Sequence, residues 1–522
     1  MTLAQRRARL GVRHHLAARA TTVEEAVDGV VALHATDPAS VYLSAWSRVR
    51  AVSVADVEHA LYTRRTLLRL LGMRRTVFVT DIATAAQVQA ACSYDIAARQ
   101  RRLLEKQLGT LGHPDNVPNP ADWLDEVLAS VEKALRARGS ATAQQLADDE
   151  PRLRQQLLMS KGKPYESIGN VTSRVLFQLA AEGHIVRGRP RGSWQSTQYY
   201  WSPLIDWLAE AAAFPGSAGK PGHSGPVAGS ARPDSVATAG LGSSGSAGQP
   251  GHSGRVAVGK PGPTDPGTAG KSGSSGSVAD AGRTGPGTAG KSGSSVGEAG
   301  RADPGTAGKS GSSVAEAGRT DPATAGKSGS SVAEAGRPDP STADWPALSE
   351  DEARAALARR WLYAFGPAPV ADLRWWTGWN AGQTKKALTA LAPAEVDLDG
   401  EPAIALPDDL APVAAPDPWI ALLPALDPTA MGWQARDWYV GPHRPALFDR
   451  SGNIGPTIWS DGRIVGAWSH RPSGEVAVRL LEDVGAEKAA AVEAEAVRLS
   501  EWLGEARVVP KFRTPAEKEL AG

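Results

Sequence analysis

A segment rich in Gly, Ser, Ala and Pro, residues 215–343, sets the first limit on how this chain folds. It contains no aromatic residue, and the phrase TAGKSGSS recurs in it, starting at Thr268, Thr288, Thr306 and Thr324. Repeated units with so few apolar side chains have nothing to bury, so the repeat does not indicate a solenoid. We predict that this Gly/Ser/Ala-rich insert is a disordered linker, and that the chain folds on either side of it.

One copy of the repeat imitates a nucleotide-binding loop. Residues 285–292 read GPGTAGKS and match the phosphate-loop pattern GxxxxGK[S/T]. A functional loop of this kind needs a buried strand before it and a helix after it, and the surrounding sequence predicts neither. The other copies carry an aspartate at the first glycine position, at Asp265, Asp303 and Asp321. We therefore reject a nucleotide-binding site here.

Composition and charge narrow the class of protein. The single cysteine, Cys92, excludes an internal disulfide and a cysteine-based zinc site, which suits an intracellular protein. No apolar run reaches the length of about 18 residues that a membrane span needs, so we expect no membrane partner. The formal net charge of +1 divides into +6 for residues 1–214, +3 for 215–343 and −8 for 344–522. A polyanion would therefore meet the N-terminal half first.

Hydrophobic periodicity in residues 1–125 predicts a module of helices closed by a strand. Helices are expected over 23–33 and 54–71, and a strand over 74–79. Helices followed by a β element are typical of a winged helix, and we interpret residues 1–125 as the first such domain.

Residues 126–214 repeat this pattern more clearly. Helices are expected over 127–137 and 168–181, and two short strands over 184–201 read as a hairpin. We interpret this region as a second winged-helix domain with a flexible, arginine-bearing wing.

Order is expected again after the linker. Residues 344–411 give three helical patterns and a hairpin around Asp399-Gly400, which predicts a third winged-helix domain. Residues 412–522 are mainly strand-like and end in a helix over 486–503, which favours a small C-terminal β-barrel or a curved sheet with one long helix. The fold class is therefore α+β, with tandem winged-helix domains followed by a β-barrel.

Two groups of arginines are candidates for DNA-phosphate contacts. Five arginines fall within twelve positions of the first module with no acidic residue among them, and three more surround the predicted wing of the second. Such runs are often only solvated faces, and that alternative stays open, but their density favours phosphate contact. The candidates are Arg64, Arg65, Arg69, Arg74, Arg75, Arg187, Arg189 and Arg191. The helix after the first group has a further basic face, formed by Arg99, Arg101, Arg102 and Lys106.

Residues 33–50, LHATDPASVYLSAWSRVR, combine polar side chains with an aromatic helix. If the first residues are extended, His34 and Thr36 point the same way and Ala35 points opposite. Asp37 precedes a proline and suits a helix cap, and aromatic and aliphatic residues then recur at helical spacing. Sequence physics alone favours the start of a helix with a buried aromatic stripe.

This stretch resembles the signature of the AlkZ/YcaQ-type winged-helix DNA glycosylases. In that family a glutamine, an apolar residue and a second glutamine or aspartate precede a similar Asp-Pro and aromatic helix. Here His34 and Thr36 occupy the two polar positions. The motifs at 422–428, 436–438, 447–450, 461–468 and 479–483 are similar to the C-terminal barrel of the same family. The resemblance covers most of the chain outside 215–343.

The resemblance implies a monomeric, cytoplasmic and nucleoid-associated protein that excises bulky or crosslinked alkylated bases from double-stranded DNA without metal or cofactor. Neutral His34 offers one acceptor nitrogen and Thr36 a hydroxyl, and together they suit the catalytic task of holding water at the anomeric carbon. With an ordinary imidazole, excision would decline as the pH falls through about 6.5. The same replacements fit a non-catalytic DNA-binding protein, such as a regulator or damage binder, and a role as a protein scaffold also stays open.

Overall fold

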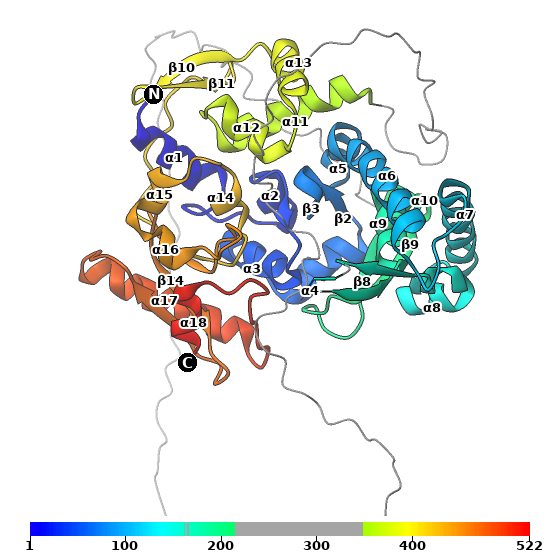
Figure 1. The fold of residues 1–522 in the computed structure, drawn as a ribbon. Helices are drawn as coiled ribbons and strands as arrows, with labels where there is room; N and C mark the ends of the chain where they lie inside the picture. The colour runs from blue at the N-terminus through cyan, green and yellow to red at the C-terminus, as the bar shows by residue number, and fades with distance from the viewer. Residues whose placement is uncertain (161, 164–165, 214–347) are drawn as a thin grey trace, which may run out of the picture. The chain divides into compact units, whose positions relative to one another are not determined.

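The structure is a computed structural model that describes residues 1–160, 162–163, 166–213 and 348–522 (Figure 1). The predicted linker over 215–343 lies outside these residues, so its disorder stays a prediction. The described segments before and after it belong to one unit, and a single hydrophobic core draws residues such as Leu33, Trp361 and Trp459 from both. None of the described helices is long and apolar enough to cross a membrane.

The N-terminal segment builds helices around a small three-stranded sheet. Its elements are α1 (Leu3–Arg13), α2 (Val23–Asp28), β1 (Leu33–His34), α3 (Pro38–Arg48), α4 (Val54–Glu58), η1 (His59–Thr63), β2 (Leu67–Gly72), β3 (Thr76–Asp81), α5 (Ile82–Val88), η3 (Gln89–Ser93) and α6 (Tyr94–Leu111). The sheet order is β1-β3-β2, and all pairs are antiparallel. The edge strand β1 therefore carries the beginning of the 33–50 stretch.

The helix predicted over 54–71 is wrong in its second half. The structure has the short helix α4, the π-helix η1 and then the strand β2. All six residues of β2 are buried. A short apolar run that is buried on both faces does not distinguish strand from helix by periodicity, which explains the error.

The next segment has its own hydrophobic core. It contains α7 (Pro120–Arg138), α8 (Ala143–Asp149), α9 (Thr172–Glu182), β8 (Ile185–Pro190), β9 (Tyr199–Pro203) and α10 (Leu204–Ala212), with short strands β4 (Gly112–His113), β5 (Ala141–Thr142), β6 (Gln156–Met159) and β7 (Ser167–Asn170). The predicted hairpin is confirmed, because β8 pairs antiparallel with β9. The helix expected from residue 168 begins at Thr172, since 167–170 pairs with β6 instead.

The segment after the linker contains the three expected helices and hairpin. These are α11 (Glu350–Phe365), α12 (Val370–Thr377), α13 (Ala381–Leu391), β10 (Ala394–Leu398) and β11 (Glu401–Ala405). Asp399 and Gly400 both have positive φ, of 50° and 90°, as a two-residue hairpin turn requires.

The C-terminal sheet is open among the described residues, so the predicted small β-barrel is wrong, and the structure agrees with the other predicted arrangement, a sheet with one long helix. Strands β12 (Ile420–Leu423), β13 (Thr457–Ser460), β14 (Arg463–His470) and β15 (Val476–Leu480) pair in that order, and the first and last strands do not meet. The long helix α17 (Ala486–Leu503) packs its Val492, Leu499 and Leu503 with Leu422 and Ile458 of the sheet. A helix therefore buries the apolar face that a barrel would have enclosed. The remaining elements are α14 (Pro428–Met431), α15 (Asp437–Val440), α16 (Arg444–Leu447) and α18 (Pro515–Ala521).

Candidate functional site

The start of the 33–50 stretch is extended, as predicted. Leu33 and His34 pair with Val79 and Phe78 of β3, and the Ala35 amide donates to the Val77 carbonyl at 2.8 Å. Residues directly opposite each other in an antiparallel pair share a face of the sheet, so His34 lies on the face that carries Phe78.

His34 is a buried histidine without a hydrogen-bond partner in the described part of the chain. Its side chain is 7% exposed, Nδ1 is buried and unbonded, and the ring meets Phe78 edge-on with centroids 5.4 Å apart. Burial, and to a lesser degree the nearby Arg74 guanidinium, lowers the pKa of His34 to about 3. The imidazole is therefore neutral at physiological pH, and the expectation of an ordinary imidazole is wrong.

Thr36 and Asp37 have different environments although they are neighbours. Thr36 is half-buried, and its hydroxyl has no hydrogen-bond partner among the described residues. Asp37 caps α3 by accepting from the Ala39 amide at 3.2 Å, and it also accepts from the Lys511 amide at 3.1 Å. The capping role predicted for Asp37 is confirmed. Burial raises the pKa of its carboxyl group.

The other end of α3 is held by a fully buried ion pair that the sequence analysis missed. Arg48 Nη2 lies 2.6 Å from Asp427 Oδ1, and both side chains are 0% exposed. The same carboxylate accepts from the Ser44 hydroxyl, and Arg48 also donates to the Thr429 hydroxyl. The available signal was an arginine inside an otherwise apolar and aromatic helix, because such a residue needs a buried partner.

The turn between β2 and β3 places two arginines in strained backbone. Arg74 and Arg75 have φ of 52° and 61°, in the left-handed region that costs a non-glycine residue about 1–2 kcal/mol. The Arg74 guanidinium lies 3.8 Å from the ring centroid of Trp375. The Arg436 guanidinium lies 4.9 Å from the same centroid. Arg75 is exposed and lies 5.1 Å from Phe177. Among the described residues neither Arg74 nor Arg75 has a carboxylate partner.

Three of the eight arginines predicted to contact DNA are neutralised within the chain. Each forms an ion pair with a glutamate: Arg64 with Glu24 at 2.8 Å, Arg65 with Glu210 at 2.5 Å, and Arg189 with Glu58. A phosphate would have to compete with these carboxylates. Arg191 is exposed on the wing and has no side-chain partner in the described ranges.

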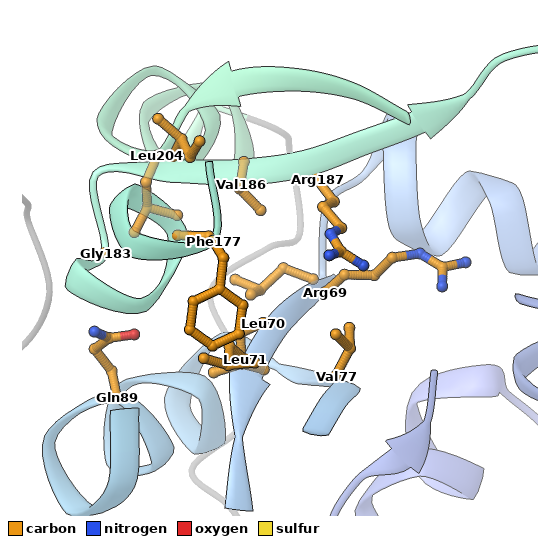
Figure 2. A pocket seen from close by; sticks show the side chains of 13 residues that line it. Arg69, Leu70, Leu71, Val77, Gln89, Phe177, Gly183, Val186, Arg187 and Leu204 are labelled. Atoms are coloured by element: carbon orange, nitrogen blue, oxygen red, sulfur yellow. The ribbon is translucent and has the colours of Figure 1, made fainter. Parts of the chain in front are cut away.

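Arg69 and Arg187 form a pair of like charges, in which Arg69 is buried and Arg187 is half-buried. Figure 2 shows their guanidinium groups side by side at one end of a cavity of about 30 Å³, away from Phe177 and Gln89. Arg69 is 2% exposed; its Nε donates to the Tyr62 hydroxyl at 3.3 Å, and its other two nitrogens have no partner among the described residues. Both guanidinium groups lie over Tyr199, at 5.3 and 5.6 Å from its ring centroid. Arg69 is therefore inside the protein and not on its surface.

The segment between β8 and β9, which was predicted to be a wing, is packed against helix α3. Trp194 at its tip lies 4.9 Å from Tyr42 of α3 and 6.1 Å from Trp502 of α17, measured between ring centroids. Tyr42 and Trp46 are buried, so the predicted aromatic stripe of α3 is confirmed. The tip of the segment that was predicted to be a flexible wing therefore lies beside the 33–50 stretch.

No group of three or more His, Cys, Asp or Glu side chains suited to a metal ion occurs within the residues that the structure describes.

The sequence matches the family model described as DNA glycosylase AlkZ-like over residues 27–237 and 313–502. A similar relative is the interstrand DNA cross-link repair glycosylase of Streptomyces sahachiroi, 30% identical over 175 residues. That match covers 32% of this chain and 47% of the relative, so it spans about half of the relative's length.

The structure resembles that of the Streptomyces sahachiroi DNA glycosylase AlkZ. The TM-score is 0.53 with 16% sequence identity, and the match covers 97% of this chain and 98% of the other. At this identity the likeness shows a shared mixed α/β fold.

Proposed function

Because the chain belongs to the AlkZ-like DNA glycosylase family, we propose that it hydrolyses the N-glycosidic bond of bulky or crosslinked alkylated bases in double-stranded DNA. The name of the Streptomyces sahachiroi relative, a cross-link repair glycosylase, supports the lesion class. In this proposal residues 1–125, 126–214 and 344–411 act as winged-helix modules, and 412–522 supports them.

The observation that carries the proposal is the state of His34. Its imidazole is neutral and lies where the resemblance places a catalytic glutamine, and its ring nitrogens have no partner among the described residues. A neutral imidazole offers one lone pair to a water molecule, as a glutamine carbonyl does. A protonated imidazole would offer none and would repel the positive charge that develops on the sugar.

The chemistry then needs little more than positioning. Alkylation at a purine ring nitrogen makes the base cationic and a good leaving group, so no strong general acid is required. His34 orients the attacking water at the anomeric carbon, and the Thr36 hydroxyl serves as a second anchor. Asp37 takes no part in this step, because its carboxylate is already bonded to two backbone amides.

The DNA backbone is held by arginines that have no carboxylate partner among the described residues. Arg74, Arg75 and Arg191 meet this condition on the strained turn and on the wing, whereas Arg64, Arg65 and Arg189 are already paired. A free guanidinium binds phosphate without first breaking an ion pair, so the first set contributes more to affinity.

A second candidate function is a non-catalytic DNA-binding protein of the same fold. The low exposure of His34, at 7%, favours it, because little of the ring reaches solvent. Both family glutamines are also replaced. In this alternative the arginines still bind the DNA backbone, and His34 and Thr36 catalyse no reaction.

A single-turnover base-release assay on a panel of alkylated duplexes tests the proposal. Release of free base by the wild-type protein supports the glycosylase. Tight, salt-dependent duplex binding without release from any lesion would favour the non-catalytic alternative, and absence of duplex binding would exclude both.

A further inference from the structure

Two arginines from different segments of the chain meet without a counter-charge. Arg69 belongs to β2 and Arg187 to β8. Figure 2 shows their guanidinium groups side by side, and both lie over the ring of Tyr199 in β9. Neither has a carboxylate partner in the part of the chain that the structure describes. Two like charges in this arrangement repel each other.

Burial makes the missing counter-charge costly. Arg69 is 2% exposed, and its Nη1 and Nη2 atoms are buried without a hydrogen-bond partner among the described residues. Its Nε donates to the Tyr62 hydroxyl, which is a neutral group. A guanidinium group keeps its proton at physiological pH, so deprotonation does not remove the charge. A buried cation with two unbonded nitrogens therefore calls for an acceptor beside it, and an anion serves best.

Space for such an acceptor lies next to the pair. Both arginines line a cavity of about 30 Å³, and their guanidinium groups lie at one end of it (Figure 2). This is about twice the volume that one water molecule needs. None of the described lining residues is acidic, and the amide of Gln89 in the lining already donates to the Ala181 carbonyl at 2.8 Å. The cavity has room for one small ion but not for a stretch of DNA backbone.

Nearby arginines with similar ring contacts show that the missing carboxylate is particular to this pair. Arg65 lies over a tryptophan ring and is paired with Glu210 at 2.5 Å. Arg189, two residues after Arg187 on β8, lies over a tyrosine ring and is paired with Glu58. Carboxylates thus balance the arginines on either side of the pair, whereas the pair itself is left with two uncompensated charges.

We propose that Arg69 and Arg187 bind a small inorganic anion of the size of chloride, taken up from dissolved salt. The N–H groups of both guanidiniums donate to the ion, and its charge removes their repulsion. Because one arginine lies on β2 and the other on β8, the ion links the first segment to the next. This site is separate from base excision and from the contact with DNA, since Arg69 is inside the protein.

Thermal melting of the full chain in sodium chloride and in sodium gluconate, at equal ionic strength, tests the proposal. Gluconate is too large for the cavity, and a ligand that binds only the folded state raises the melting temperature. Arg187→Gln should reduce the difference between the two salts by on the order of one to two degrees relative to the wild type. Arg102→Gln, at an exposed position outside the cavity, is the matched control and should respond as the wild type does.

The line width of the chloride NMR signal gives a direct reading, because exchange of the ion with a protein site broadens it. The wild type and Arg102→Gln should broaden the signal equally. Arg187→Gln should bind chloride roughly tenfold more weakly or worse, because it loses a charged donor. Arg69→Met should abolish the broadening, and Arg187→Gln keeps the test valid if that variant does not fold.

Two outcomes would overturn the proposal. If the wild type and Arg187→Gln respond alike in both measurements, water alone fills the cavity. If duplex DNA removes the broadening, the DNA backbone rather than a free ion is the anion that these arginines bind. Base release has no bearing on either outcome, so this site and the proposed glycosylase activity can fail separately.

Discussion

The buried polar groups near the two ends of helix α3 differ in their hydrogen bonding. At the C-terminal end the Arg48 guanidinium and the Asp427 carboxylate are fully buried and bonded to each other and to nearby hydroxyl groups. Before the N-terminal end, in β1, the His34 imidazole is also buried, but in contrast to the capping Asp37 nothing in the described ranges bonds to it. Buried polar groups are almost always bonded, so the first pattern indicates a structural role, and the second leaves the imidazole available to a water molecule, as the proposed function requires.

Two histidines sharpen the comparison. His14 is 0% exposed, its Nε2 lies 3.1 Å from the Ala364 carbonyl, and its Nδ1 lies 2.9 Å from the Thr429 hydroxyl. Its neutral ring thus donates through Nε2 and accepts through Nδ1. Burial and the neighbouring Arg48 hold the pKa of His14 well below its usual range. His34 is neutral for the same main reason, but without these bonds its lone pair stays available.

The largest effect is expected at the bonded end. Arg48→Met should lower the free energy of unfolding by about 3–5 kcal/mol, because it leaves the Asp427 carboxylate buried without its partner. Arg50→Met, at an exposed position two residues later, should change it by less than about 0.5 kcal/mol. Chemical denaturation of the three proteins measures both values. Equal stabilities would show that the ion pair is not structural.

At His34, near the other end of α3, the expected effect is on the rate of base release. His34→Ala should slow base release by on the order of a hundredfold, which is typical of losing one positioned catalytic group. Thr36→Val should cost less, because a hydroxyl is the weaker anchor for water. Both variants should keep duplex affinity, since neither side chain contacts phosphate in the proposed complex. Single-turnover rates are compared with binding measured on the same duplex.

Two results would remove this contrast between the ends. If the wild type and His34→Ala release base equally fast, His34 is not catalytic. If neither protein releases base while both bind duplex, the protein has no glycosylase activity on that duplex, and the unbonded imidazole of His34 has no catalytic role.

The low pKa of His34 predicts different pH dependences for the excision rate and for the free energy of unfolding. With a His34 pKa of about 3, the neutral ring persists and excision should stay flat from about pH 8 to 5, where an ordinary imidazole would already lose its lone pair. Stability behaves differently. The unfolded histidine takes up a proton below its ordinary value of 6.5, while the folded one does not. Its contribution is therefore complete above pH 6.5 and is lost as the pH falls toward 3.

The size of this loss is about 1.4 kcal/mol per pH unit for each such histidine. His34→Gln cannot titrate, so its unfolding free energy should fall less steeply than that of the wild type between about pH 6 and 5. Denaturant titrations at several pH values compare the two slopes. Identical slopes would mean that His34 is protonated in the folded protein.

Local features of this molecule were predictable and distant ones were not. The Asp37 cap and the aromatic stripe of α3 depend on neighbours in sequence, and both were predicted. The partner of Arg48 lies 379 positions away, beyond the reach of any local pattern. The low pKa of His34 depends on Phe78 and Arg74, which only the folding of β3 against β1 brings close. The sequence did not decide between a barrel and an open sheet with one long helix, because strand patterns do not reveal that α17 covers the sheet.

The smallest effect is expected on DNA binding, for two arginines of the predicted wing that differ in whether they form an ion pair. Arg189 and Arg191 are both exposed, but Arg189 is paired with Glu58, while Arg191 has no side-chain partner in the described part of the chain. If the wing contacts DNA, Arg191→Gln should reduce the slope of log Kobs against log salt by about one unit. Arg189→Gln should reduce it less, because its charge is already neutralised and its release leaves Glu58 to repel phosphate. Equal reductions would show that the Arg189 ion pair opens in the complex, and no change in either would place the wing outside the interface. The pair of variants therefore asks whether internal pairing, rather than exposure, decides which arginines of this protein meet DNA.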